Sequence, residues 1–187
     1  MQPDDEMTDA LAEKIFSGTV GGVLNTPLTW KQKNMPKRAH KPVHVEAWAP
    51  LKTDLSCRLE LRMRIGLDVL WEYTLMVLHP SDRTCLKRLD IRGTHLDRET
   101  GEGYLNRTHK HKWSKARGNK DVYAPNDIRH NPDPILGATL ESMDEEYDRV
   151  VRDFIAECKM TIGGAYAWVP PAVPLTQPTF DGLEDYP

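Results

Sequence analysis

The strict alternation of apolar and charged side chains from Ser56 to Ile65 is the feature that most constrains the fold of this chain. The apolar members of the alternation are Cys57, Leu59, Leu61, Met63 and Ile65. The charged members between them are Arg58, Glu60, Arg62 and Arg64. Because successive side chains of a β-strand point to opposite faces, the segment presents one apolar and one charged face. The pattern is typical of an antiparallel strand with one face in water.

Neighbouring segments predict further strands. Residues 43–47 alternate in the same way, whereas Val69 to Leu78 is apolar on both faces, which favours a central position in the sheet. Thr84 to Arg92 and Tyr104 to Trp113 are the next two expected strands. Because the connections are short and contain Gly or Pro, the sequence favours an antiparallel meander of about four to five strands over parallel βαβ units.

The apolar spacing becomes helical near the C-terminus. A stripe at i, i+3, i+4 and i+7 runs through Met143, Tyr147, Val150, Val151, Phe154, Ile155 and Cys158. Ser142 and Glu145 have the spacing of a capping box, which predicts the start of the helix there. Similar spacing between Asp4 and Ser17 predicts a short N-terminal helix. The predicted fold class is therefore α+β, with an antiparallel sheet packed by a C-terminal amphipathic helix.

Length and composition favour one domain. A chain of 187 residues, of which 39% are hydrophobic, is long enough to bury one core. We expect a single α+β domain over residues 1–162, in which residues 1–42 hold the N-terminal helix and a basic linker. Within that linker, Trp30 to Pro42 is interpreted as a loop because it is basic and contains two prolines.

Residues 163–187 form a tail that is rich in Pro and contains acidic residues but no Lys or Arg. Such a composition predicts irregular or disordered chain. The aromatic residues Tyr166, Trp168 and Phe180 in this tail have two interpretations. They either staple the tail across the domain or dock it on a partner, and the sequence leaves both open.

Charge and hydropathy exclude some classes of protein. The formal net charge of -3 gives no global indication of nucleic acid or of an anionic membrane. The longest strongly apolar stretch, Leu67 to Leu78, contains Asp68 and Glu72 and is too short to span a bilayer. The N-terminus lacks the pattern of a signal peptide, and the three cysteines are widely spaced. We therefore expect a cytoplasmic protein with buried thiols and no membrane association.

The most reactive-looking segment is Arg107-Thr-His-Lys-His-Lys-Trp113, which continues through Lys115, Arg117 and Lys120 without an acidic residue. On a strand, side chains two residues apart share a face. One face of this strand is expected to carry Arg107, His109, His111 and Trp113. The opposite face is expected to carry Thr108, Lys110 and Lys112.

In the first chemical hypothesis, His109 and His111 act as acid and base on a phosphodiester, because imidazoles exchange protons near neutral pH. Arg107 stabilises the charge that develops on the phosphate, and neither a metal nor a cofactor is required. Nucleic-acid contacts, which combine positive charge with a stacking surface, are expected from Lys110, Lys112, Trp113, Lys115 and Arg117. Whether Arg58, Arg62 and Arg64 extend this surface depends on strand order, which the sequence leaves open.

Two further hypotheses use the same segment. His109 and His111 can form a metal site with Asp90, or with His95 and Asp97, since imidazole and carboxylate suit Zn, Mn or Fe. The surrounding Lys and Arg residues oppose the binding of a dication, which ranks this site below metal-free chemistry. In the third hypothesis the segment is an ordinary solvated strand edge, whose lysines protect the sheet from aggregation.

The order of several short motifs resembles bacterial toxins of the TumE type over about residues 84–160. The motifs are Leu86-Lys-Arg-Leu-Asp90, then His95, then Thr108-His-Lys-His111, then an acidic helix that contains Asp153-Phe-Ile. Members of that family have an antiparallel sheet, a strand close to Arg-Tyr-Asp-Asn with a nearby His, and a His-x-His stretch before a final helix. The resemblance implies that family roles, including catalysis, carry over to Asp90, His95, His109 and His111.

The resemblance also implies a growth-inhibiting activity against RNA and an antitoxin protein that silences it. The chain departs from the family in Ile91-Arg92 after the aspartate, in its extended N-terminal third and in its Pro-rich tail. The sequence thus predicts a nucleic-acid-directed effector, a ribonuclease-like toxin of a toxin-antitoxin pair. The alternative is a non-catalytic interaction protein, related to phage or defence functions, that binds nucleic acid or a protein through its basic segment.

Overall fold

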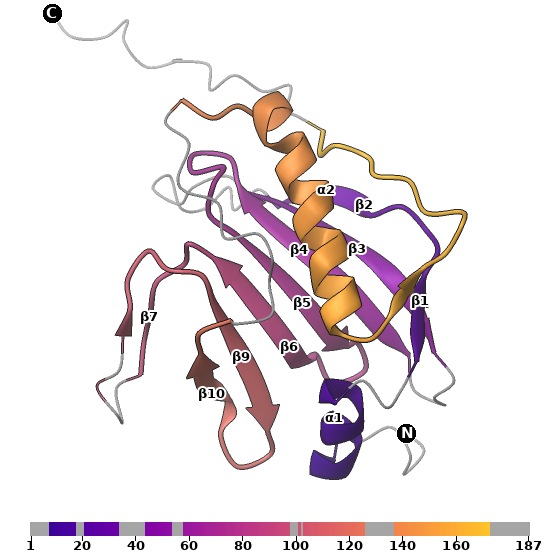
Figure 1. Ribbon diagram of the computed structural model, residues 1–187, viewed down its shortest axis with the longest axis vertical. Helices are drawn as coiled ribbons and strands as arrows, with labels where there is room; N and C mark the ends of the chain where they lie inside the picture. The colour runs from indigo at the N-terminus through magenta and orange to yellow at the C-terminus, as the bar shows by residue number, and fades with distance from the viewer. Residues whose placement is uncertain are drawn as a thin grey trace, which may run out of the picture.

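The computed structural model describes residues 8–17, 21–33, 44–53, 58–97, 101, 103–125 and 137–172. The fold is α+β, with two helices and a large, mostly antiparallel sheet (Figure 1). Within the described residues the main sheet has nine strands, in the order β10-β9-β6-β5-β4-β3-β1-β11, and β2 also pairs with β3. A separate two-stranded hairpin is formed by β7 and β8.

The bounds of the strands are β1 Gly22–Leu24, β2 Thr29–Lys33, β3 His44–Thr53, β4 Leu59–Gly66, β5 Tyr73–His79, β6 Thr84–Ile91, β7 His95–Leu96, β8 Gly103–Tyr104, β9 His109–Ser114, β10 Gly118–Tyr123 and β11 Thr161–Ile162. The helices are α1 Asp9–Phe16 and α2 Leu140–Glu157. The strands from β3 to β6 pair with one another in chain order, and β9 and β10 continue the antiparallel meander.

The prediction of about four to five strands is wrong, because it misses short strands at the sheet edges. The strands β1 and β11 have 3 and 2 residues, too few to show an alternation in sequence. The strand β2 begins at Thr29 and overlaps the start of the segment from Trp30 to Pro42 that was expected to be a loop. The stretch from Tyr104 to Trp113 is divided into β8 and β9 by a turn in which Asn106 has φ 50°.

The strand register gives the sheet two chemically different faces. On one face, which we call the open face, Glu46, Arg64, Thr74, Asp90 and His109 pair in a row across five strands. The neighbouring row on the same face consists of Trp48, Arg62, Met76, Arg88 and His111. The residues between them point to the helix-covered face and are buried, among them Val45, Ala47, Leu61, Met63, Ile65, Leu75, Leu89 and Ile91.

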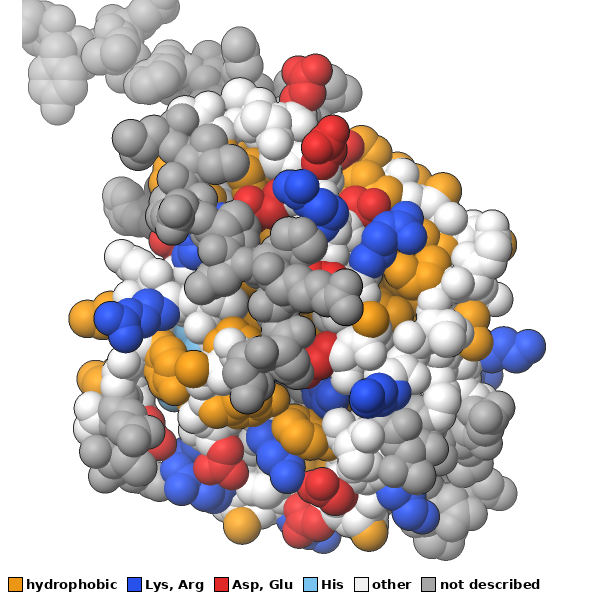
Figure 2. Space-filling view, in the orientation of Figure 1, with side chains coloured by type: hydrophobic (Ala, Val, Ile, Leu, Met, Phe, Trp, Pro, Cys, Tyr) orange, Lys and Arg blue, Asp and Glu red, His pale blue; other side chains and the backbone are white. Residues whose placement is uncertain are grey.

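The helix α2 lies across the second of these faces (Figure 1). The Tyr147 ring meets the Tyr73 ring of β5 edge-on, with 5.0 Å between centroids, and its hydroxyl donates to the carbonyl oxygen of Leu70 at 2.8 Å. Beside them, Glu146 is buried, accepts from Tyr73 and pairs with Arg92. On the outer surface of this side, the described acidic and basic side chains are mixed (Figure 2). Neither described helix is both long and apolar enough to cross a membrane.

The start of α2 differs from the predicted one. Thr139 is the N-cap, and its hydroxyl oxygen accepts from the Ser142 N–H at 3.2 Å. In return the Ser142 hydroxyl oxygen accepts from the Thr139 N–H at 2.8 Å, which completes a capping box one turn before the expected one. Ser142 therefore lies inside the helix, because Thr139 has the extended backbone that an N-cap needs.

The helix α1 occupies part of the segment predicted to be helical. Thr8 caps it by accepting from the Leu11 N–H at 3.2 Å, and residues 4–7 of the prediction lie outside the described residues. Ile15 is buried in the core. The Phe16 ring lies 4.7 Å from Lys87 Nζ and 4.6 Å from Lys112 Nζ, so cation–π contacts join α1 to β6 and β9.

Residues 163–172 of the tail are irregular, as predicted, and pack on the domain. Trp168 donates its indole N–H to Asp144 Oδ1 at 2.5 Å, and its ring meets Trp30 edge-on with 6.0 Å between centroids. Trp30 donates its own indole N–H to the carbonyl oxygen of Val169 at 2.8 Å. Of the two interpretations of the tail aromatics, the staple is the one that Tyr166 and Trp168 follow, while Phe180 lies outside the described residues.

We predict that Trp168→Ala lowers the free energy of unfolding by about 1–3 kcal/mol, because it removes an aromatic contact and a hydrogen bond to α2. Urea unfolding measures the change, monitored by far-UV circular dichroism because this signal does not depend on tryptophan fluorescence. The matched control is Val169→Ala, whose side chain is 42% exposed and whose carbonyl group remains. Equal stabilities of the two variants would show that the staple adds nothing to the fold.

Candidate functional site

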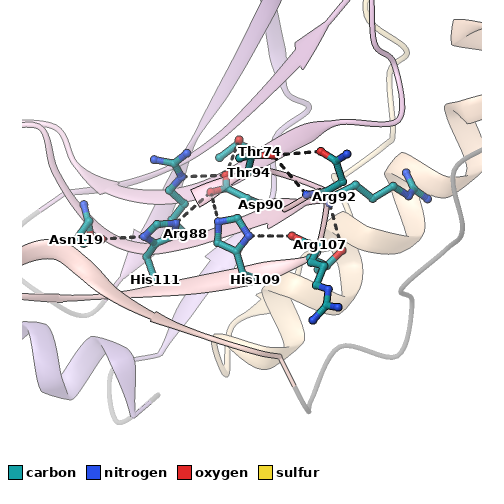
Figure 3. A network of polar contacts seen from close by, with 11 residues as sticks. Thr74, Arg88, Asp90, Arg92, Thr94, Arg107, His109, His111 and Asn119 are labelled. Atoms are coloured by element: carbon teal, nitrogen blue, oxygen red, sulfur yellow. Dashed lines mark hydrogen bonds and ion pairs between the residues drawn. The ribbon is translucent and has the colours of Figure 1, made fainter. Parts of the chain in front are cut away.

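The carboxylate of Asp90 is the centre of a polar cluster on the open face (Figure 3). Its Oδ1 atom accepts from the Thr74 hydroxyl at 2.7 Å and from Arg88 Nε at 2.9 Å. Its Oδ2 atom lies 3.1 Å from His111 Nε2 and 3.2 Å from His109 Nε2. One carboxylate therefore joins side chains of β5, β6 and β9.

The two imidazoles of β9 reach the carboxylate because of strand register. His109 pairs with Asp90 and His111 pairs with Arg88 across the β6–β9 ladder, so both rings project from the face that carries the carboxylate. Their other ring nitrogens are also engaged. The Nδ1 atom of His109 lies 2.8 Å from the carbonyl oxygen of Arg107, and that of His111 lies 2.8 Å from the carbonyl oxygen of Asn119.

A third imidazole comes from the β7–β8 hairpin. The ring of His95 lies 5.0 Å from the His111 ring and 5.9 Å from the His109 ring, measured between centroids. From β8, the Tyr104 ring lies 5.2 Å from the His109 ring. One nitrogen from each of the three histidines lies within 4.8 Å of the other two. The hairpin thus completes a three-histidine cluster beside Asp90, which we call the His–Asp cluster.

Burial and charge determine the protonation of the cluster. His109 and His111 are 0% and 2% exposed, whereas His95 is half-buried. Burial alone raises the pKa of the Asp90 carboxyl, but its contacts with the His109 and His111 rings and the charge of Arg88 hold that pKa far below its usual range. Burial, and then the charges of His111 and His109, lower the pKa of His95. Asp90 is therefore an anion and His95 favours its neutral form.

Two pockets adjoin the His–Asp cluster. The first, of about 150 Å³, is lined by His95, Asp97, Tyr104, Arg117, Lys120, Asp121 and Val122, and we call it the His95 pocket. The second, of about 260 Å³, lies on the side of the Asp90 carboxylate and includes Arg64, Thr74 and Arg88 in its wall. His95 is the histidine of the cluster that lines the first pocket, so it is the imidazole that a bound molecule there can contact.

Lys110 and Lys112 lie on the other face, as the alternation predicted. Lys110 is 1% exposed, and its Nζ lies 2.7 Å from Glu157 Oε2 of α2. The nucleic-acid contact predicted from Lys110 is therefore corrected, because α2 covers this side chain. Lys112 pairs with Glu13 of α1 at 2.9 Å, but its side chain is 40% exposed, so the contact predicted from it stays a prediction.

The remaining predicted residues are spread over the site. Arg107 contributes its carbonyl oxygen, while its exposed side chain extends away from Asp90 (Figure 3). Arg117 lines the His95 pocket and pairs with Asp97 at 3.1 Å. Lys115 is exposed and donates its backbone N–H to Asp9 Oδ1 at 2.6 Å, and Trp113 packs partly buried against the core. Arg107 is therefore not the arginine of the cluster.

Arg88, rather than Arg107, is the arginine that lies beside the two histidines, because its Nε donates to Asp90 Oδ1 at 2.9 Å. The sequence carries a signal for it, since Arg88 precedes Asp90 by two residues on a strand and must share its face. Thr74 and Tyr104 were also missed as site residues. Their membership depends on strand pairing and on the return of the β7–β8 hairpin, for which the sequence carries no signal.

The arrangement supports two kinds of chemistry. Imidazoles beside a pocket with Arg117 and Lys120 can handle protons next to a bound anion. The same imidazoles with Asp90 form a ligand set for a transition metal. Comparisons with protein-family models, with curated proteins and with solved structures find no match for this chain. The site geometry therefore carries the functional conclusion by itself.

We predict that Glu157→Gln destabilises the protein by about 3–5 kcal/mol, because it leaves the buried ammonium groups of Lys110 and Lys87 without their carboxylate. Thermal and urea unfolding measure the loss. Glu145→Gln, which removes an exposed carboxylate from the same helix, is the matched control and is expected to change stability by less than about 0.5 kcal/mol. A Glu157→Gln protein as stable as this control would contradict the role of the pair.

Proposed function

We propose that this protein is a nucleic-acid-directed effector that cleaves RNA at the His–Asp cluster. The observation that carries the proposal is the position of His95, which joins the buried imidazoles of His109 and His111 to a pocket containing Arg117 and Lys120. Cleavage of a phosphodiester requires positive charge at the phosphate oxygens and a group that handles the proton of the attacking oxygen. In support of the proposal, this pocket holds His95, Lys120 and Arg117, although Arg117 also pairs with Asp97 and Asp121 of the pocket wall.

The open face supplies a surface along which RNA can bind. Arg64 lies in the row of Asp90, and Arg62 and Arg88 lie in the neighbouring row of His111, so these arginines of β4 and β6 lead toward the cluster. Trp48 lies in the row of Arg62 and is half-buried, with Lys31 Nζ 5.6 Å from its ring centroid. Arginines beside an aromatic ring suit a phosphate backbone with a stacked base. The basic surface in this proposal is therefore the open face rather than the lysines of β9.

The buried imidazoles act differently from the acid and base pair expected from the sequence. His109 and His111 are 0% and 2% exposed and both approach Asp90, so neither is free to reach a substrate as a separate proton carrier. In this proposal His95 contacts the substrate. His109, His111 and Asp90 lie behind His95 and support it.

The resemblance to TumE-type toxins extends the proposal to a toxin of a toxin-antitoxin pair. Support comes from the four positions to which family roles carry over, since Asp90, His95, His109 and His111 form one cluster. An antitoxin is then the expected protein partner. Growth inhibition on expression, relieved by co-expression of an adjacent small gene, is the observation that tests this part of the proposal.

A second candidate function is RNA binding without cleavage. The near-complete burial of His109 and His111 favours it, because an imidazole pair bound to one carboxylate also serves to hold strands together. The two functions differ in one outcome. A folded protein that binds RNA through the open face but releases no cleaved product has the second function.

For the binding surface, we predict that Arg62→Ala combined with Arg64→Ala weakens RNA binding roughly tenfold. The double variant is also expected to reduce the salt dependence of the affinity by the amount that about two phosphate contacts contribute. Titration of a labelled single-stranded RNA at several salt concentrations measures both effects. The control is Arg149→Ala, which removes an exposed arginine from α2. An equal loss of affinity in this control would place the RNA contact elsewhere.

For the reaction, we predict that His95→Ala slows RNA cleavage by at least roughly 100-fold while RNA binding is retained. Single-turnover cleavage of an end-labelled RNA measures the rate. His79→Gln is the matched control, because His79 also faces a carboxylate, Asp82 at 2.9 Å, but lies outside the cluster. Cleavage by the His95→Ala variant at the wild-type rate would show that His95 has no role in the reaction.

A further inference from the structure

The ring orientations of the two β9 histidines leave a nitrogen lone pair of each pointing at one carboxylate. Their Nδ1 atoms lie 2.8 Å from the carbonyl oxygens of Arg107 and Asn119. A carbonyl oxygen only accepts, so each Nδ1 carries the ring proton, and in the neutral ring Nε2 then has the lone pair. The Nε2 atoms of His109 and His111 lie 3.2 and 3.1 Å from Asp90 Oδ2, which is an acceptor too. This geometry suits a cation between the rings and the carboxylate, which is either a proton on each ring or one metal ion.

Two nitrogens of the cluster are buried without a hydrogen-bond partner among the described residues. They are Nε2 of His109, whose side chain is fully buried, and Nε2 of His95. The His109 atom approaches Asp90 Oδ2 but makes no hydrogen bond with it. An unpaired buried nitrogen costs free energy, and native structures contain few of them without a function. In His109, the atom that lacks a partner is the one that approaches Asp90 Oδ2.

The spacing of these atoms matches the ligands of a tetrahedral ion. With bonds of about 2.0–2.1 Å, two ligands of a tetrahedral Zn²⁺ are about 3.3 Å apart. The two Nε2 atoms lie 3.1 and 3.2 Å from Oδ2, and one nitrogen of His95 lies within 4.8 Å of the other histidine nitrogens. His95 belongs to a two-stranded hairpin outside the main sheet, so a small shift of that hairpin brings its ring inward.

The surroundings of the ligands are also those of a metal site. Histidines that bind metals donate their other N–H group to a backbone carbonyl or a carboxylate, as His109 and His111 do to carbonyl oxygens. The carboxylate is held from behind, since Oδ1 of Asp90 accepts from Thr74 and Arg88 and leaves Oδ2 directed at the imidazoles. These contacts fix the ligands before an ion binds.

From this geometry we infer that His95, His109, His111 and Asp90 form a binding site for a divalent transition metal, with Zn²⁺ as the best match to three imidazoles and one carboxylate. The lysines that opposed a metal in the sequence lie on the other face, where Lys110 and Lys112 pair with Glu157 and Glu13. The dication carries the same formal charge as two protons on the two buried imidazoles. Arg88 does stay beside the ligands, but it binds the other oxygen of the Asp90 carboxylate.

The metal site would add to the proposed cleavage of RNA, but metal binding does not depend on that function. Bound at His95, the ion adjoins the pocket that holds Arg117 and Lys120, where it supplies positive charge for a phosphate oxygen. Metal binding itself requires no RNA. The site can therefore be tested on the purified full-length chain.

The experiment measures Zn²⁺ binding to the full chain after chelator treatment, by calorimetry, and the visible absorption of the Co²⁺ complex. We expect one equivalent of Zn²⁺ and the absorption of Co²⁺ bound by nitrogen and oxygen. His95→Ala and Asp90→Asn are each expected to weaken Zn²⁺ binding by at least roughly 100-fold, as the loss of a ligand does. His79→Gln is expected to bind as the wild type does.

Because removal of a buried histidine can prevent folding, His95→Ala, on the hairpin, is the decisive variant. Its folding is checked by circular dichroism, and Zn²⁺ is expected to raise the melting temperature of the wild type but not that of this variant. The inference is overturned if the wild type binds no Zn²⁺, or if folded His95→Ala and Asp90→Asn both bind it as the wild type does.

The outcomes for the site and for the proposed function are separate. Zn²⁺ binding at the cluster without RNA cleavage by the loaded protein retains the metal site and rejects the ribonuclease. RNA cleavage that survives chelation, by a protein that binds no Zn²⁺, retains the ribonuclease and rejects the metal site. Cleavage that is lost on chelation and restored by Zn²⁺ supports both.

Discussion

The contact on which the site depends is the sharing of one buried carboxylate by three strands. Asp90 of β6 binds Thr74 of β5 through one oxygen and approaches two imidazoles of β9 through the other. A buried carboxylate that lost these partners would carry an uncompensated charge, so the strands must meet in one register. The same register directs the lysines of β9 toward the helices, where Lys110 meets Glu157. The register that this carboxylate requires therefore decides which face of the sheet carries the candidate site and which face packs against the helices.

Much of the sheet could be predicted from the sequence because alternation is a local property. The segment from Ser56 to Ile65 shows its two faces without knowledge of its neighbours, and β4 is found within it at Leu59–Gly66. The same rule correctly assigned His109 and His111 to one face and Lys110 to the other. The sequence also offered a metal site, of His109 and His111 with Asp90 or with His95 and Asp97, and ranked it below metal-free chemistry because of the surrounding Lys and Arg residues.

What the sequence could not provide is the pairing of distant segments. Arg62 reaches the face of His111 only because β4, β5, β6 and β9 are consecutive neighbours in the sheet. His95 reaches the cluster only because its hairpin returns to the open face. Glu157 neutralises Lys110 from a helix that begins 30 residues later in the chain, at Leu140. Each of these contacts depends on tertiary structure, and local patterns carry no information about it.

The pairing of β1 with β11 has a consequence for the order in which the protein folds. Val23 lies opposite Thr161 in a parallel ladder, and Trp30 donates to the carbonyl oxygen of Val169, 139 residues away. Contacts between such distant residues close a large loop, which slows folding. During synthesis the meander from β3 to β10 can form on the emerging chain, and β1 can pair with β3, whereas the second neighbour of β1 is missing until β11 has left the ribosome. Among the described strands, β1 is thus translated early but gains its second partner late.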